Sequence, residues 1–253
     1  MKNKFFYILP MILLSLGIGC DPVNDGTAPI VDPVVKSSSK WLVGENNIKT
    51  VLYQYKEFND EGKLIELCNF HLDGTIQAKS TYVWEHNVSS ETKVIYDESG
   101  QLLETDKIKY TYDEESFSSD SPVLVSKELL NDKGEVTQTL KFNYDNQGRL
   151  VKTTETNYST GSTNETQYNY QFNANGNLVE KVTKTAEGEV KDRDSLTYYG
   201  ELNRIDVYNF AGEGELVTRK TYIYNNYGKI VEELEIDTLG IVIRKFIYEY
   251  TYF

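Results

Sequence analysis

The chain has 253 residues and carries 39 acidic against 26 basic side chains, a net charge of −13. So acidic a surface repels phosphate backbones and anionic lipids, which argues against nucleic-acid binding. The 20 tyrosines and 10 phenylalanines argue against disorder, because disordered segments are poor in aromatic residues. Frequent Tyr and Thr are instead typical of strands that are half buried on a pleated surface.

The N-terminal residues 1–19 predict a signal peptide. Lys2 and Lys4 precede an apolar run over 5–18 that is too short for a stable membrane span. The sequence LGIGC over 16–20 resembles a bacterial lipobox, and this resemblance implies that Cys20 is lipidated and becomes the first mature residue. An ordinary secretory signal with an incidental cysteine is the alternative.

Residues 20–40 are expected to be a flexible linker after the lipidated cysteine. They contain Pro22, Pro29 and Pro33 and end in a run of serines, a composition typical of spacers rather than packed structure. The linker would hold a folded domain over 41–253 away from the membrane.

One turn pattern recurs ten times from residue 58 onwards. A hydrophobic residue is followed by two or three polar residues, a glycine, one further residue and an aliphatic residue. Asp and Asn stabilise such turns, and glycine adopts positive φ without steric cost. The predicted turn glycines are Gly62, Gly74, Gly100, Gly134, Gly148, Gly176, Gly188, Gly214, Gly228 and Gly240. Turns without this mark are expected over 85–90, 114–120, 159–163 and 200–203.

The fold class predicted from these turns is all-β. No segment has a sustained helical period, and strands joined by short turns must be antiparallel neighbours. The turns separate about 15 strands of a long antiparallel β-meander of repeated hairpins. Because twist accumulates, we expect the sheet to curl into a spiral, an open barrel or a two-layer sheet. Whether it closes is left open.

Aromatic residues alternate with polar ones along these strands, so one face of the sheet is aromatic and the other is wet. The aromatic face has two interpretations. It is either the inward side of the curled sheet or an exposed platform that stacks on a sugar or a peptide. The candidate ligand-stacking residues are Trp41, Trp84, Tyr82, Tyr168 and Tyr170.

The heptad YDNQGRL over 144–150 resembles the core of the YD (RHS) repeat family, with looser copies over 96–102, 172–178 and 224–230. The resemblance covers about residues 50–253. In large RHS proteins such repeats form a β shell around a C-terminal toxin, whereas this chain ends in a strand. It looks like a short envelope member of that family without a toxin domain. The turns are also similar to MORN-type repeats of some immunity proteins.

No pattern of catalytic or metal-binding residues stands out. His71 and His86 lack the spacing of a zinc site, and no nucleophile elbow or phosphate loop is present. Cys68 is expected to be a small buried residue. Acidic residues in the turns are interpreted as turn formers, with calcium binding by neighbouring loops as the alternative. We expect no enzyme activity, no cofactor and no metal.

These observations predict a non-enzymatic lipoprotein, anchored by lipid in the bacterial cell envelope at the outer membrane. It would be a repeat scaffold that binds a glycan or another envelope protein. An immunity or accessory protein of a polymorphic-toxin system is the alternative. A glycan-active enzyme is the third hypothesis.

Overall fold

The computed structural model describes residues 34–116, 122–200, 203–212 and 214–253. These residues form sixteen antiparallel strands and one short 3-10 turn, η1 (Glu45–Asn47), which confirms the all-β meander. The strands are β1 (Val35–Val43), β2 (Lys49–Phe58), β3 (Leu64–Phe70), β4 (Ile76–Glu85), β5 (Val88–Tyr96), β6 (Leu102–Tyr112), β7 (Leu124–Leu130), β8 (Val136–Tyr144), β9 (Leu150–Asn157), β10 (Ser162–Phe172), β11 (Leu178–Thr185), β12 (Val190–Tyr199), β13 (Arg204–Ala211), β14 (Glu215–Tyr224), β15 (Ile230–Ile236) and β16 (Val242–Tyr252).

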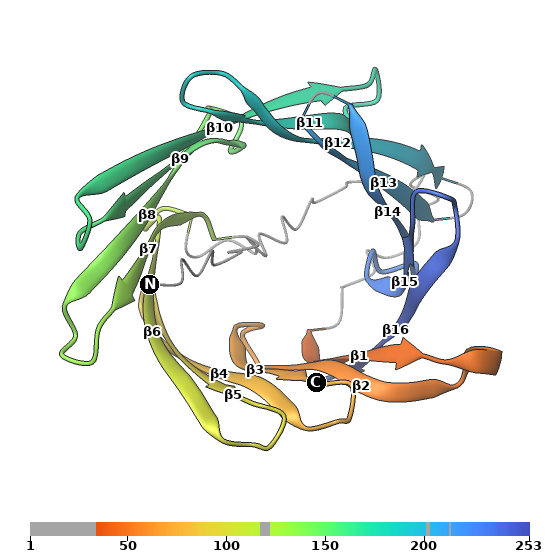
Figure 1. Ribbon diagram of the computed structural model, residues 1–253, viewed down its shortest axis with the longest axis horizontal. Helices are drawn as coiled ribbons and strands as arrows, with labels where there is room; N and C mark the ends of the chain where they lie inside the picture. The colour runs from red at the N-terminus through yellow and green to blue at the C-terminus, as the bar shows by residue number, and fades with distance from the viewer. Residues whose placement is uncertain (1–33, 117–121, 201–202, 213) are drawn as a thin grey trace, which may run out of the picture.

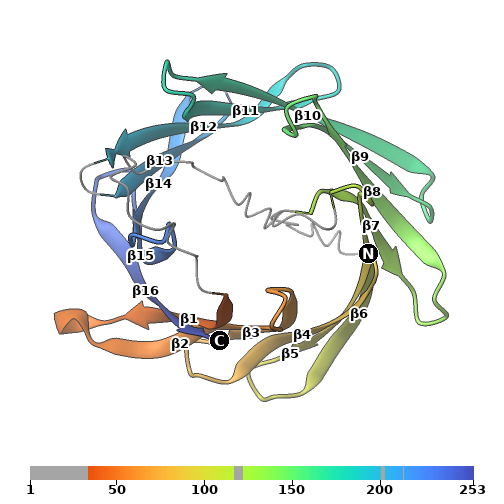
Figure 2. The same cartoon turned by 180° about the vertical axis from the view of Figure 1, so that it is seen from behind.

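The strands close into a barrel in which every strand pairs with its neighbours in sequence and β1 also pairs with β16. The ring is seen end-on in Figure 1 and from behind in Figure 2. Lys40 of β1 lies opposite Tyr248 of β16 on one side and Gln54 of β2 on the other. Closure removes both free edges, which would otherwise be templates for aggregation.

Strand β1 was not expected from the sequence, and it accounts for sixteen strands in place of about 15. It takes in residues 35–40, which the sequence placed in the linker. Its serines contribute no apolar side chain to a core. The strand is held instead by backbone pairing to β16 on one side and β2 on the other. The hydroxyl of Ser37 adds a 2.8 Å hydrogen bond with Thr251. The expected signal peptide, Cys20 and the linker up to residue 33 lie outside the described residues.

The repeated motif builds a five-residue hairpin loop, as the turn after β8 illustrates. The Asp145 amide donates to the Arg149 carbonyl at 2.9 Å, and the Gly148 amide donates to the Asp145 carbonyl at 3.0 Å. The Asp145 carboxylate accepts from the amides of Gln147 and Arg149, both at 2.9 Å. Tyr144 and Leu150 then face each other as the first cross-strand pair.

Nine of the ten expected turn glycines have positive φ, in the conformation that L-residues adopt with strain. They are Gly62, Gly74, Gly100, Gly134, Gly148, Gly176, Gly188, Gly228 and Gly240. Gly214 differs. Here Gly212 has a φ of 53°, and its amide donates to the Lys191 carbonyl at 2.8 Å, so the positive-φ position has moved two residues earlier. Ala211 pairs with Glu215, so three residues separate the paired positions here, whereas five separate Tyr144 from Leu150 in the turn after β8.

The two faces of the wall differ in composition. We call the face that carries Tyr82, Tyr110, Tyr168, Tyr222 and Tyr248 the tyrosine face, and most of the buried side chains belong to it. Because side chains converge on the concave side of a closed sheet, we infer that it points into the barrel. It also carries charged residues, so the expected division into an aromatic and a wet face is incomplete.

The two ends of the barrel are also distinct. The terminal end holds the first and last described residues, where the Phe253 amide donates to the Val34 carbonyl at 3.2 Å. Even-numbered strands run towards this end. The distal end holds eight of the connections between strands, beginning with the loop between β1 and β2 over 44–48.

Candidate functional site

A buried glutamate between two tyrosines and next to a lysine forms the first polar cluster of the inner wall. Glu91 of β5 is 6% exposed and lies opposite Tyr82 of β4. The Tyr110 hydroxyl of β6 donates to Glu91, and the Lys127 ammonium of β7 lies 5.7 Å from the centre of the Tyr110 ring. Burial raises the pKa of Tyr110 and lowers that of Lys127.

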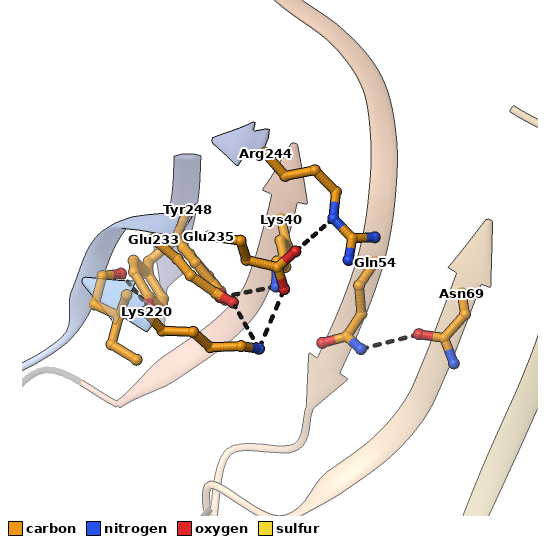
Figure 3. Close-up of polar contacts among 10 residues, drawn as sticks. Lys40, Gln54, Asn69, Lys220, Glu233, Glu235, Arg244 and Tyr248 are labelled. Carbon is orange, nitrogen blue, oxygen red and sulfur yellow. Dashed lines mark hydrogen bonds and ion pairs between the residues drawn. The ribbon is translucent and has the colours of Figure 1, made fainter. Parts of the chain in front are cut away.

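The same arrangement recurs where the barrel closes. Glu233 of β15 is 4% exposed and lies opposite Tyr222 of β14. The Tyr248 hydroxyl of β16 donates to Glu233 Oε2 at 2.5 Å, and Lys40 Nζ of β1 donates to the same oxygen at 2.8 Å. Figure 3 shows Lys40, Glu233 and Tyr248 converging across three strands. Tyrosine, glutamate, tyrosine and lysine thus follow one another on four consecutive strands in both clusters.

Further charges complete the cluster at the closure. Lys220 Nζ lies 3.6 Å from Glu233 and 3.1 Å from Glu235, and Arg244 pairs with the second oxygen of Glu235. Burial raises the pKa of Glu233, but the charge and hydrogen bond of Lys40 and the Tyr248 hydroxyl outweigh it, so its pKa is lowered overall. Every carboxylate of this cluster is therefore engaged with a cation of the wall.

A third position, on β8 to β11, has a related arrangement without a glutamate. Phe142 of β8 lies opposite Thr153 of β9, and the Tyr168 hydroxyl lies 3.4 Å from the Thr153 hydroxyl. Lys181 Nζ lies 5.3 Å from the centre of the Tyr168 ring. A threonine therefore replaces the glutamate while the ring and the lysine remain. The tyrosine and the lysine therefore lie together on neighbouring strands even where no carboxylate lies between them.

The five expected stacking residues do not form one platform. Tyr82 and Trp84 lie on β4, and Tyr168 and Tyr170 lie on β10, six strands away along the sheet. Trp41 neighbours Lys40 on β1 and therefore lies on the opposite face of the wall.

Two of these rings donate hydrogen bonds to backbone carbonyls of the wall. Trp84 Nε1 donates to the Leu64 carbonyl at 2.8 Å, and the Tyr170 hydroxyl donates to the Leu150 carbonyl at 2.6 Å. Burial raises the pKa of Tyr170 to about 12. These two side chains are fixed parts of the barrel wall.

A buried carboxylate on the outward face was missed by the sequence reasoning. Asp206 of β13 is fully buried and accepts two 2.8 Å hydrogen bonds from Arg204, one of 2.5 Å from Arg219 and one of 2.8 Å from the Thr221 hydroxyl. Burial raises the pKa of Asp206, but these donors lower it overall. The alternation of Arg204 and Asp206 can be seen in the sequence. The proximity of Arg219 cannot, because it depends on how β13 and β14 pair.

Four of the turn carboxylates accept hydrogen bonds from amides of their own turns. Besides Asp145, Asp73, Asp97 and Asp237 accept hydrogen bonds from amides two or four residues later. Within the described ranges, no three His, Cys, Asp or Glu side chains group so that they could hold a metal ion. In the same part of the chain, no helix is long and apolar enough to cross a membrane. Cys68 is buried, which raises the pKa of its thiol to about 11.

Exposed aliphatic side chains gather at the distal end. We call them the distal rim, and the largest exposed fractions are 82% for Leu239, 67% for Leu72 and 63% for Leu103. The distal rim consists of Ile48, Leu72, Ile76, Leu102, Leu103, Val136, Val217, Leu239, Ile241, Val242 and Ile243.

Comparisons with solved structures find alignments at low identity, with TM-scores under 0.5. No family model matches the sequence. No curated protein matches it either. A porin-like protein from Bacteroides vulgatus aligns over 86% of this chain and 98% of its own, with 11% identity and a TM-score of 0.46. A porin-like protein from Bacteroides uniformis aligns over 87% and 98%, with 10% identity and a TM-score of 0.35. A chain of the Tc holotoxin pore of Photorhabdus luminescens aligns over 85% of this chain but 13% of its own, with 10% identity and a TM-score of 0.20.

Proposed function

We propose that the protein is a non-enzymatic scaffold of the bacterial cell envelope that binds another envelope protein. The observation that carries this proposal is the distal rim. Large exposed aliphatic residues at one end of a barrel are costly in water unless they are covered. A partner protein would cover them.

The inner wall favours this function over catalysis. Glu91 and Glu233 are each held by a tyrosine hydroxyl, and Glu233 is also paired with Lys40. Acid–base catalysis needs a carboxylate that can reach the substrate and change its protonation state there. These two carboxylates are committed to the wall, so we expect the protein to have no enzyme activity.

Glycan binding is the weaker form of the scaffold hypothesis. Stacking on a sugar needs a ring face that is free and several rings in one row. The candidate rings are divided between β4, β10 and the outward face of β1, and Trp84 and Tyr170 are bonded to backbone carbonyls. An immunity or accessory role would use the same surface with a toxin-system protein as the partner.

Lipid anchoring at Cys20 fits the same proposal. Residues 21–33 separate Cys20 from Val34, which lies at the terminal end. A barrel anchored there would direct its distal rim away from the anchoring membrane and towards other envelope components. Changing Cys20 to Ser should release the protein from the membrane fraction. If the Cys20→Ser protein still partitions into the detergent phase with the membrane proteins, the lipid anchor is contradicted.

Partner binding is tested by photo-cross-linking in the native cells. A photoreactive amino acid is placed at Leu103 on the distal rim, and at Val83 near the terminal end in a separate strain. A discrete cross-linked protein from at least one position is the expected result. Absence of any cross-linked protein from both positions would overturn the scaffold function.

A further inference from the structure

We infer that the distal rim is a docking surface for a protein that presents apolar side chains among lysines and arginines. This inference rests on the proposed scaffold function and adds the location of the interface and the chemistry of the partner. It follows from a difference between the two barrel ends, from the position of the exposed residues around the ring and from the charge of the turns among them.

The first observation is that equivalent positions are covered at one end and exposed at the other. Each motif places an aliphatic residue at the start of the following strand. At the terminal end, Leu150 is only 3% exposed, and Tyr170 lies beside it through the hydrogen bond to its carbonyl. At the distal end, Leu102 is 62% and Val242 is 51% exposed. The same motif therefore buries its aliphatic residue at the terminal end after β8 and leaves it exposed at the distal end after β5 and β15.

The second observation is that the exposed residues are continuous around the ring. Most of them lie in five neighbouring connections or in the first two residues of the strand that follows each one, from β15–β16 through β1–β2, β3–β4 and β5–β6 to β7–β8. The β11–β12 connection on the opposite side contributes none among the described residues. The apolar surface is therefore an arc on one side of the distal end, which fits a partner of defined shape better than a flat membrane that would meet the whole ring.

The third observation is the charge of this arc. Its five connections, over 237–241, 44–48, 71–75, 97–101 and 131–135, contain seven carboxylates and one lysine. Such a surface repels anionic lipids and a second copy of itself, because like charges would face each other. It attracts a cationic partner and leaves the aliphatic residues between the carboxylates to bind that partner's apolar side chains.

The closed sheet restricts how the partner binds. A barrel has no free strand edge, so the partner cannot add a strand by backbone hydrogen bonding. Recognition must come from side chains of the loops and strand ends. The aliphatic residues would supply the buried contact area, and the carboxylates would orient the partner.

The test uses a synthetic helical peptide with leucines on one face and lysines on the other, titrated by fluorescence anisotropy against the full chain carrying Cys20→Ser. The rim variant adds Leu102→Ser, Leu103→Ser and Ile243→Ser, three exposed positions whose change should leave the barrel folded. A matched control variant changes exposed apolar residues of the terminal end, Val34→Ser, Val83→Ser and Phe253→Ser. Two control peptides replace every lysine by glutamate or every leucine by serine.

The rim variant should bind the leucine–lysine peptide about tenfold more weakly, since apolar contact area is lost, while the terminal-end variant binds as before. Both control peptides should bind more weakly than the leucine–lysine peptide. Equal binding by the rim variant, or by the serine–lysine peptide, would overturn the inference. Two further results would overturn it. One is a dimer, seen by light scattering, that forms with the unchanged rim and is lost in the rim variant. The other is co-sedimentation with phosphatidylcholine vesicles that the unchanged rim shows and the rim variant loses.

Failure of this inference differs from failure of the scaffold function. Cross-linking in cells from position 83 but not from 103 would place the partner at the terminal end, which contradicts the distal site and leaves the scaffold function standing. Cross-linking from neither position contradicts both.

Discussion

The hydroxyl of Tyr170 donates a 2.6 Å hydrogen bond to the carbonyl of Leu150, 20 residues earlier in the chain. The same spacing links Tyr144 to Leu124 and Tyr250 to Ile230, both at 2.7 Å, and Trp84 to Leu64 at 2.8 Å. In each case an aromatic residue near the end of an even strand is tied to the first residue of the strand before it. These four bonds fasten hairpins at the terminal end.

Changing Tyr170 to Phe should lower the free energy of unfolding by about 1 kcal/mol, because the hydrogen bond to a part-buried carbonyl is lost. Urea denaturation followed by circular dichroism measures the change. Tyr227→Phe removes a hydroxyl from an exposed ring of the terminal-end turn over 225–229 and serves as the control. Equal midpoints for both variants would show that the bond to Leu150 contributes nothing.

Changing Gly148 to Ala should cost about 1–2 kcal/mol, because its φ of +74° is strained for any residue with a Cβ. No neighbouring atom lies within 4 Å of the added Cβ, so the cost comes from the backbone alone. Gly214→Ala is the matched control, since its surroundings are equally open and its φ is not positive. Thermal denaturation should therefore show a clear loss for Gly148→Ala and little change for Gly214→Ala.

Stability should fall in acid through Glu233. Its pKa in the folded protein is lowered, so its contribution is present above the ordinary glutamate pKa and is lost as the pH falls through the folded value. Glu233→Gln should flatten the stability profile below about pH 4.3 relative to the parent protein. Glu98→Gln, in an exposed turn, controls for the loss of one negative charge. If the free energy of unfolding of Glu233→Gln falls with decreasing pH as steeply as that of the parent protein, the coupling to Lys40 is contradicted.

Changing Asp206 to Asn should destabilise the barrel by about 3 kcal/mol, because Arg204 and Arg219 would lose the carboxylate that they share. The half-exposed pair of Lys152 and Glu165, at 3.0 Å, offers the comparison. Lys152→Met should cost less than about 1 kcal/mol, because solvent screens this pair. A similar cost for both variants, measured by urea denaturation, would show that Asp206 is no more important than a surface ion pair.

The turn motif allowed most of the architecture to be predicted because it acts locally. Asp145 bonds to amides of its own loop, and Gly148 supplies the one conformation that the loop needs, so both signals are visible within seven residues. Strand β1 carried no such signal. Its serines are strand residues only because β2 and β16 lie on either side of it.

The sequence by itself determined the all-β meander, since short turns oblige successive strands to pair. Only the tertiary structure decided that the two ends of the meander meet, because the bonds between β1 and β16 join residues more than 200 positions apart. It also decided that Lys40 and Glu233 share a buried cluster and that the exposed aliphatic residues gather mostly at the distal end. These properties depend on which strands become neighbours, a relation that no local pattern encodes.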